Sequence, residues 1–299
     1  MPAFAQPRAS RVWLALPERG GIFEEAALAL RATLGRSNPN ADVQVGLWNE
    51  LGAEVHGVPG VVVAMGTPAL RGLLELAGSS AARRGWPMVA ALLPKSAFEA
   101  HPIPSGMRVT AVFLDQPLGR YAELIRVALP ELTRVGVVMG PASAGLRAEL
   151  AAAMQQRRLT LEDHILSPSA GPDALFPALS DVLQRSDVLL ALPDPLVVSA
   201  ASLQNLLIAA YRQREPVVSF AASHVRAGAS LALYTTPTQS AVQAAGVVAG
   251  LLAGGALPAP QFSSTFEVGV NERVLRSLGL AAPDPEVLTR TLRQREGGR

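Results

Sequence analysis

Residues 134–156 read RVGVVMGPASAGLRAELAAAMQQ, and this stretch decides the fold because an earlier stretch repeats its pattern. It begins with a short apolar run typical of a buried strand, continues with the turn residues GPAS, and ends in a helical pattern. Near the N-terminus, residues 11–16 (RVWLAL) precede the loop PERGG and a helical stretch over 22–34. Both halves of the chain therefore start with the same strand-loop-helix unit.

The later strands repeat at similar intervals. Val12 and Val61 are 49 positions apart, and the corresponding Val135 and Val188 are 53 apart. Short apolar strands that alternate with helices indicate βαβ units, with parallel strands and right-handed crossovers. We expect an α/β protein of two lobes, each a parallel sheet flanked by helices.

The last third of the chain does not form another such unit. A helix over 238–252, a Gly/Pro connector and a strand over 266–271 most simply return to complete the first lobe. We therefore assign residues 1–115 and about 237–283 to lobe one. Lobe two takes 116–236, with the tail 284–299 added to it. A chain that crosses between lobes several times can act as a hinge that closes around a ligand.

The composition excludes several classes of protein. In 299 residues, 49% are hydrophobic and 17% charged, which supplies ample core material and argues against disorder. The formal net charge is only +2, with Arg interspersed among acids, so we do not expect nucleic-acid binding. The absence of cysteine excludes disulfides, thiolate nucleophiles and iron–sulfur clusters.

The sequence also shows no clear catalytic or metal-binding pattern. The sequence lacks both G-x-x-x-x-G-K-[ST] and G-x-G-x-x-G, and Pro141 stands where a nucleophile elbow needs Gly. The four histidines lack metal-ligand spacing: His56, His101, His164 and His224. We expect no enzyme, no cofactor and no metal.

Ligands in parallel sheets bind beyond the carboxyl ends of the strands, where helices start. Gly66-Thr67-Pro68 and Asp194-Pro195 follow equivalent strands in the two halves, and each resembles a capped helix start with Pro in the first position. Free N–H groups at the Thr67 helix favour a carboxylate, and Asp194 favours an ammonium group. The pair predicts a clamp for an amino-acid zwitterion. The alternative is that both residues only cap their helices.

Four further residues complete the predicted ligand contacts. They are Ser143, a donor in the first loop of lobe two; Glu18, in the loop after the first strand; Ser219, near the end of the strand at 216–220; and Tyr234, an aromatic side chain suited to stacking.

The N-terminus has the small-x-small pattern of a signal-peptidase site at Ala3-Phe4-Ala5, before polar Gln6. One interpretation is an ordinary frayed terminus. The other is an exported, periplasmic protein whose signal peptide is removed before Gln6. No apolar run reaches the roughly 18 residues that a membrane span needs.

Residues 188–234 read VLLALPDPLVVSAASLQNLLIAAYRQREPVVSFAASHVRAGASLALY. They resemble the second lobe of a family of ABC-transporter substrate-binding proteins whose characterised relatives bind tryptophan or other aromatic amino acids. The matching features are the acidic loop at Asp194, the proline-led strand at Pro216 and Gly228-Ala229. Residues 61–69 (VVVAMGTPA) are similar to the family's first-lobe strand and turn.

The resemblance implies a periplasmic-binding-protein-like type I fold and delivery of a small solute to a membrane permease. It also implies that Thr67 and Asp194 contact the ligand. A sensor or accessory module without a permease, and less readily a cleft enzyme, remain open as alternatives.

Overall fold

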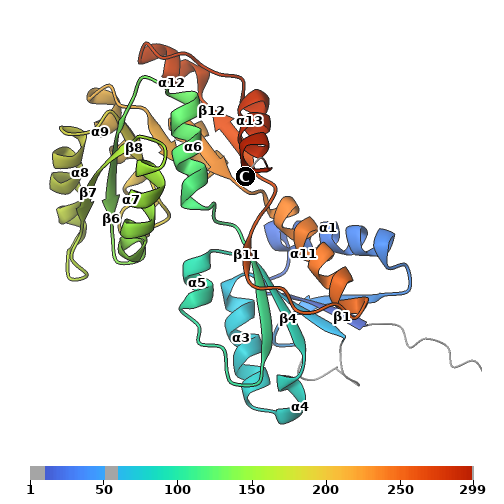
Figure 1. Cartoon of the computed structure of the whole chain (residues 1–299). Coiled ribbons are helices and arrows are strands. Elements are labelled where there is room, and N and C mark those ends of the chain that lie inside the picture. Colours follow the sequence, from blue (N-terminus) through green and yellow to red (C-terminus); the bar gives the residue numbers. More distant parts are fainter. Residues whose placement is uncertain (1–10, 51–59, 298–299) are drawn as a thin grey trace, which may run out of the picture. The chain divides into compact units, whose positions relative to one another are not determined.

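The computed structural model describes residues 11–50 and 60–297, which form two compact units (Figure 1). Unit 1 comprises the residues up to Asp115 and Thr235–Thr265, and unit 2 comprises Gln116–Tyr234 and the residues from Phe266 onward. The chain therefore passes from one unit to the other three times. The predicted signal-peptidase site and His56 lie outside the described residues.

Unit 1 is built around a six-stranded sheet with the strand order β11-β5-β4-β3-β1-β2. All its strand pairs are parallel. Its strands are β1 (Arg11–Leu16), β2 (Asp42–Leu47), β3 (Val61–Met65), β4 (Pro87–Leu93), β5 (Arg108–Phe113) and β11 (Gln261–Phe262). Its helices are α1 (Gly21–Ser37), α3 (Thr67–Gly78), α4 (Ala81–Arg84), α5 (Lys95–Glu99) and α11 (Pro237–Leu252).

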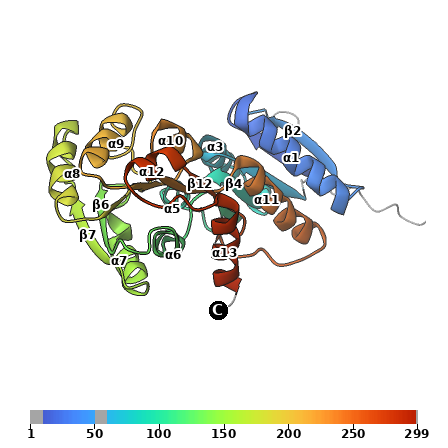
Figure 2. The ribbon, with the colours of Figure 1, turned by 90° about the horizontal axis from the view of Figure 1, so that it is seen from above.

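Helices cover both faces of this sheet because alternate strand residues point to opposite sides. On one face, Val12 and Val63 pack with apolar residues of α1 and α11, which lie side by side (Figure 2). On the other, Trp13 and Val62 pack against α3. Strands that are buried on both faces explain the continuous apolar runs in the sequence.

Unit 2 repeats the plan with the order β12-β10-β9-β8-β6-β7. Its strands are β6 (Arg134–Met139), β7 (Thr160–Ile165), β8 (Val188–Leu190), β9 (Val217–Ser219), β10 (Leu231–Tyr234) and β12 (Glu267–Val270). Its helices are α6 (Leu118–Ala128), the 3-10 turn η1 (Ala144–Leu146), α7 (Arg147–Gln155), the 3-10 turn η2 (Pro172–Ala174), α8 (Leu175–Leu183), α9 (Leu203–Arg212), α10 (Ala222–Ala227), α12 (Glu272–Ser277) and α13 (Pro285–Gly297).

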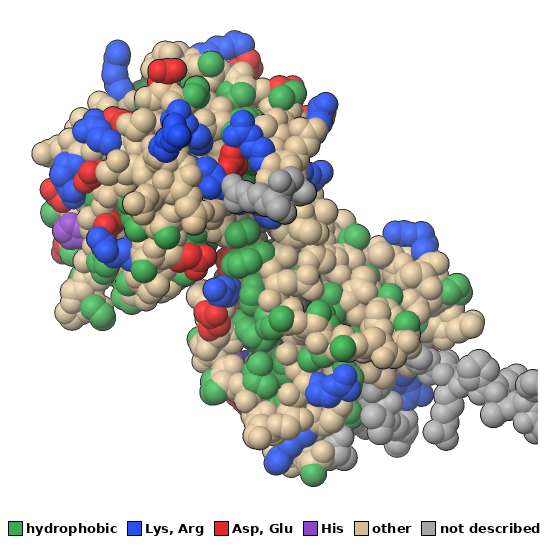
Figure 3. Space-filling view, in the orientation of Figure 1, with side chains coloured by type: hydrophobic (Ala, Val, Ile, Leu, Met, Phe, Trp, Pro, Cys, Tyr) green, Lys and Arg blue, Asp and Glu red, His purple; other side chains and the backbone are tan. Residues whose placement is uncertain are grey.

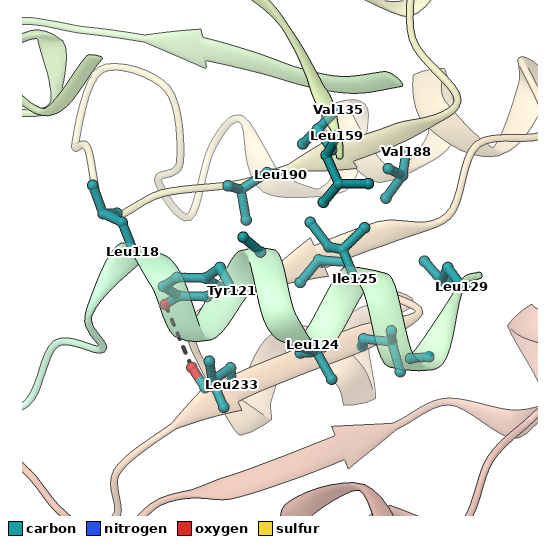
Figure 4. Packing of buried hydrophobic residues seen from close by; sticks show 14 of the residues in the cluster. Leu118, Tyr121, Leu124, Ile125, Leu129, Val135, Leu159, Val188, Leu190 and Leu233 are labelled. Atoms are coloured by element: carbon teal, nitrogen blue, oxygen red, sulfur yellow. Dashed lines mark hydrogen bonds between the residues drawn. The ribbon is translucent and has the colours of Figure 1, made fainter. Parts of the chain in front are cut away.

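Its two sheet faces are covered by different helix groups. Helices α6, α7, α12 and α13 pack on one face, where Ile125 of α6 points toward Val188 and Leu124 lies on the side of Leu233 (Figure 4). The Tyr121 hydroxyl of α6 donates a hydrogen bond to the Leu233 carbonyl at 3.5 Å. Helices α8 and α9 cover the other face. The predicted α/β class, with two parallel-dominated sheets flanked by helices, is confirmed.

Residues 266–283 belong to unit 2, although the sequence pattern had favoured lobe one for them. Strand β12 pairs antiparallel with β10, with Leu231 opposite Val270. Phe266 and Leu275 are fully buried in the core that contains Leu231. Of the described elements after Tyr234, α11 and β11 belong to unit 1.

Candidate ligand-binding site

Both sheets have a topological switch point. There the chain first adds a strand on one side of a central strand, and the following strands are added on its opposite side. In unit 1 it lies between β1 and β3, and in unit 2 between β6 and β8. Crevices at the carboxyl ends of strands at such points are where open α/β sheets bind ligands. The loops at these ends contain Glu18 and Gly66-Thr67-Pro68 in unit 1, and Ser143 and Asp194 in unit 2.

At the unit 1 switch point, the N-cap of α3 is Gly66 rather than Thr67, so the predicted cap was wrong by one residue. Thr67 is the first helical residue and Pro68 the second. Gly66 has φ 86°, a conformation that costs Gly little and other residues considerably more. Among the described residues, no side chain caps this helix. The first N–H groups of a helix have no intrahelical partner, so this end of α3 suits an anionic oxygen.

An aromatic ring lies directly beside this helix start. A Cβ at Gly66 would come within 2.8 Å of Cε1 of Phe23, so only Gly allows the ring of Phe23 to pack this closely. Phe23 is on the first turn of α1 and is partly exposed. The unit 1 switch point thus combines a helix N-terminus with a ring that can contact the apolar part of a ligand.

Two acidic residues of unit 1, Glu18 and Asp115, follow strands of its sheet and differ in exposure. Glu18 is exposed. At the start of α1, which follows this loop, the Gly20 amide donates a hydrogen bond to Oε2 of Glu24 at 2.7 Å. This amide therefore already has a partner within the chain. Asp115 lies after β5 and accepts a hydrogen bond from the Lys95 amide after β4. Burial raises the pKa of Asp115, and the bond from Lys95 opposes that rise.

In unit 2, Asp194 and Ser143 tie together the two loops of the switch point. Oδ2 of Asp194 accepts hydrogen bonds from the amide and the hydroxyl of Ser143, both at 2.9 Å. Oδ1 accepts from the Leu196 amide at 3.0 Å. A Cβ at Gly140 would lie 2.4 Å from Oδ1, so Gly at this position makes room for the carboxylate.

The predicted helix start at Asp194-Pro195 was wrong. Helix α9 begins at Leu203, and the chain between runs through turns. Asp194 is 2% exposed and both of its oxygens accept hydrogen bonds from its own unit. This geometry supports a positioning role for Asp194, in which it holds the loops that would contact a ligand.

The remaining predicted residues lie at the ends of the next two strands of the same edge. Ser219 is fully buried, and its hydroxyl lies 2.6 Å from Nδ1 of His224. The Tyr234 hydroxyl donates to Oε2 of Glu267 at 3.2 Å. Burial raises the pKa of Tyr234, and the nearby Glu267 acts in the same direction. His224 was not among the predicted contacts, although its spacing of five from Ser219 was visible.

An open groove of about 580 Å³ is lined by residues of β12 and α13, including Val268, Thr289 and Arg290. Among the residues that the structure describes, no group of His, Asp or Glu is arranged to hold a metal ion. Within the same residues, no helix has the length and apolar character to span a membrane.

The model of the family described as "ABC transporter substrate binding protein" matches residues 59–292, more than three quarters of the chain. The chain belongs to this family. The resemblance noted in the sequence is thereby confirmed. The chain is a substrate-binding protein of the ABC-transporter type, rather than an enzyme, and such proteins present a small molecule to a permease outside the cytoplasm.

Solved structures share the fold at low sequence identity. A conserved domain protein from Vibrio cholerae has a TM-score of 0.59 at 20% identity, over 93% of this chain and 97% of that one. A ligand-free, open substrate-binding protein from Clostridium difficile reaches 0.67 at 15%, over 92% and 97%. A domain from Streptococcus pneumonia in complex with L-Trp reaches 0.59 at 16%, over 94% and 98%. None of the curated proteins compared with the chain matches it.

Proposed function

We propose that this protein binds an amino acid or a related carboxylate, closes its two units around it, and delivers it to an ABC permease. The observation that carries the ligand class is the uncapped start of α3 at Gly66-Thr67, beside the partly exposed ring of Phe23. The helix end favours a carboxylate. The ring favours an apolar or aromatic side chain.

The related structures leave both ligand classes to be tested. One holds L-Trp, and another is a periplasmic ribose ABC transporter protein from Conexibacter woesei with a TM-score of 0.57 at 14% identity. Identity this low supports the fold alone, so our choice of a carboxylate rests on the residues of this chain. We also propose a periplasmic location after removal of a signal peptide before Gln6.

The direct test is to identify what the protein binds. Mass spectrometry of small molecules retained through purification comes first. A thermal-shift panel of the twenty amino acids, small carboxylates and sugars follows. A ligand at about 100 times its Kd adds roughly 2.7 kcal/mol to the free energy of unfolding, so a true ligand is readily detected. Stabilisation by sugars alone would reject the carboxylate.

The contribution of α3 is tested with variants. Thr67→Ala should weaken binding modestly, because the helix N–H groups remain. Gly66→Ala should weaken it more, because a Cβ would displace Phe23. A sensor without a permease is the second candidate function, since it uses the same fold. Co-purification with a permease, or its absence, separates the two.

A further inference from the structure

His224, near the carboxyl end of β9, forms a hydrogen bond with a buried hydroxyl through one ring nitrogen, and its other ring nitrogen is available to a ligand. Ser219, the last residue of β9, lies 2.6 Å from Nδ1 of His224 in α10. Ser219 is fully buried, whereas His224 is partly exposed. In the part of the chain that the structure describes, Nε2 of His224 has no hydrogen-bond partner.

The burial of Ser219 decides which group donates. Within the described residues, His224 is the only hydrogen-bond partner of this hydroxyl. A buried donor without an acceptor costs about 1–3 kcal/mol, so the hydroxyl donates to Nδ1. In neutral imidazole the proton then resides on Nε2, which makes Nε2 a donor.

The aromatic ring of Phe220 lies against His224. Phe220 packs edge to face on the imidazole, with ring centroids 4.8 Å apart and planes at 80°. Phe220 is partly exposed and follows β9, the strand next to β8 at the switch point. One donor and one apolar surface therefore stand at the edge where this fold binds ligands.

The groups around His224 include charges of both signs. Burial lowers the pKa of His224. Helix α10 packs against β10 and β12, whose titratable side chains are Tyr234 and Glu267, and it also contains Arg226. A sugar hydroxyl uses an acceptor as well as a donor, whereas Nε2–H of His224 supplies a donor only. A carboxylate needs only donors.

We propose that His224 contacts the ligand, with Nε2–H donating to a carboxylate oxygen and Phe220 packing on the ligand's apolar part. This inference rests on the proposed function and adds the residues that unit 2 contributes. Ser219 is then a positioning residue that sets the tautomer and orientation of His224.

The first measurement is calorimetric titration of His224→Leu with L-tryptophan and with each carboxylate that stabilises the wild-type protein. Loss of a hydrogen bond to an anionic oxygen should raise Kd about tenfold or more. His224→Gln retains a donor and should recover part of the affinity. His164→Leu is the matched control, because His164 lies on β7 at the far edge of the same sheet and should leave Kd unchanged.

The second measurement is a two-bond proton–nitrogen NMR spectrum of the imidazole rings, assigned with the same variants. The free protein should show His224 protonated on Nε2. Bound carboxylate should raise the pKa of His224, and D-ribose should not. Ser219→Ala should shift the tautomer population and raise Kd by less than His224→Leu does.

Each outcome decides between the two proposals. Equal Kd for wild type and His224→Leu, or an unmoved His224 signal with a bound carboxylate, overturns this inference and leaves the proposed function standing. If only neutral sugars bind, this inference and the proposed carboxylate ligand are both wrong, but the protein still binds a solute. If no compound of the panel binds, the inference and the proposed function both fail.

Discussion

Asp194 is the residue at which structure and sequence suggest different experiments. A capping carboxylate tolerates Asn, because Asn caps a helix about as well as Asp does. Here, however, Oδ1 and Oδ2 of Asp194 both accept amide hydrogen bonds in a buried site. After Asp194→Asn, the side-chain NH2 group would face one of those donors, so one backbone amide would lose its acceptor.

We therefore predict that Asp194→Asn lowers the free energy of unfolding by about 1–3 kcal/mol. Chemical denaturation measures this, with Asp173→Asn as the control because Asp173 is exposed. If the two variants are equally stable, the hydrogen bonds between the Ser143 and Asp194 loops contribute nothing to the free energy of unfolding. If Asp194→Asn keeps its stability but binds an identified amino acid less tightly, Asp194 contacts the ligand as its sequence position predicted.

Glu215 gives a pH dependence that is independent of any ligand. Burial, opposed by a hydrogen bond from Ser186 and helped by the nearby Asp187, raises the pKa of Glu215 from 4.5 to about 7. A carboxyl whose pKa is higher in the folded state binds its proton more tightly there. Its contribution to stability is therefore present below pH 4.5 and is lost as the pH rises through about 7.

Glu215→Gln should consequently be more stable than the wild type at pH 8, by about 1–3 kcal/mol, and nearly equal to it at about pH 4.5. The free energy of unfolding at the two pH values tests this. Glu149→Gln, at an exposed position of α7, is the control. A stability difference independent of pH would show that the ionisation of Glu215 is the same in the folded and unfolded states.

Sequence alone located the loops of the candidate site but not their contacts. Gly66-Thr67-Pro68 and Asp194 were recognised because turn residues follow apolar runs. The bonds between Ser143 and Asp194 span 51 positions, and no local pattern encodes such a pairing. His224 was missed for a different reason, because a spacing of five across a strand and a helix gives no periodic signal.

At the scale of elements, α13 is held to unit 2 by a network of charges. Glu123 of α6 accepts hydrogen bonds from Arg157 and from Arg295 of α13. Arg120 of α6 pairs with Glu296, and its guanidinium lies 4.0 Å from the centroid of the Phe266 ring. Burial would raise the pKa of Glu123, but the bonds from the two arginines outweigh it and lower the pKa.

We predict that Glu123→Gln lowers the free energy of unfolding by about 3 kcal/mol, because it removes the buried negative charge that compensates the guanidinium of Arg157. Arg295→Ala should cost about 1 kcal/mol or less, since half of this side chain is exposed. Hydrogen exchange should show faster opening of α13 in Glu123→Gln. Arg290→Ala, on the same helix, is the control. Unchanged exchange in α13 would mean that apolar contacts alone hold it.

Two elements show why local signals mislead. Pro195 indicated a helix start, yet the hydroxyls of Ser199 and Ser202 bond to each other and to nearby backbone, which competes with helix formation. A strand was expected at 266–271 and β12 spans Glu267–Val270, but its alternation of apolar residues does not say which sheet it joins. That depends on packing of Phe266 and Leu275 in the unit 2 core.

For the whole molecule, the repeated spacing in the sequence was sufficient to predict two sheets of the same plan. A doubled βαβ pattern has few compact solutions, because crossovers are right-handed and sequential elements pack as neighbours. Acidic and basic side chains are interspersed on the face of unit 2 drawn in Figure 3.

Closure is the prediction that belongs to the whole molecule. Three segments connect the units, next to residues 115, 234 and 265, so a ligand that contacts both units would shift their equilibrium toward a closed arrangement. The radius of gyration in solution scattering should fall when an identified ligand saturates the protein. The chain contains no cysteine, which allows a second and more specific measurement.

Ala32→Cys on α1 and Ala152→Cys on α7 place one exposed thiol in each unit for a pair of dyes. Energy transfer between them should change on ligand addition with the same midpoint as calorimetric binding. Gly66→Ala in the same labelled background should move that midpoint to higher ligand concentration, since it disturbs the contact of unit 1. A saturating ligand that alters neither energy transfer nor scattering would mean that the solute binds to one unit alone.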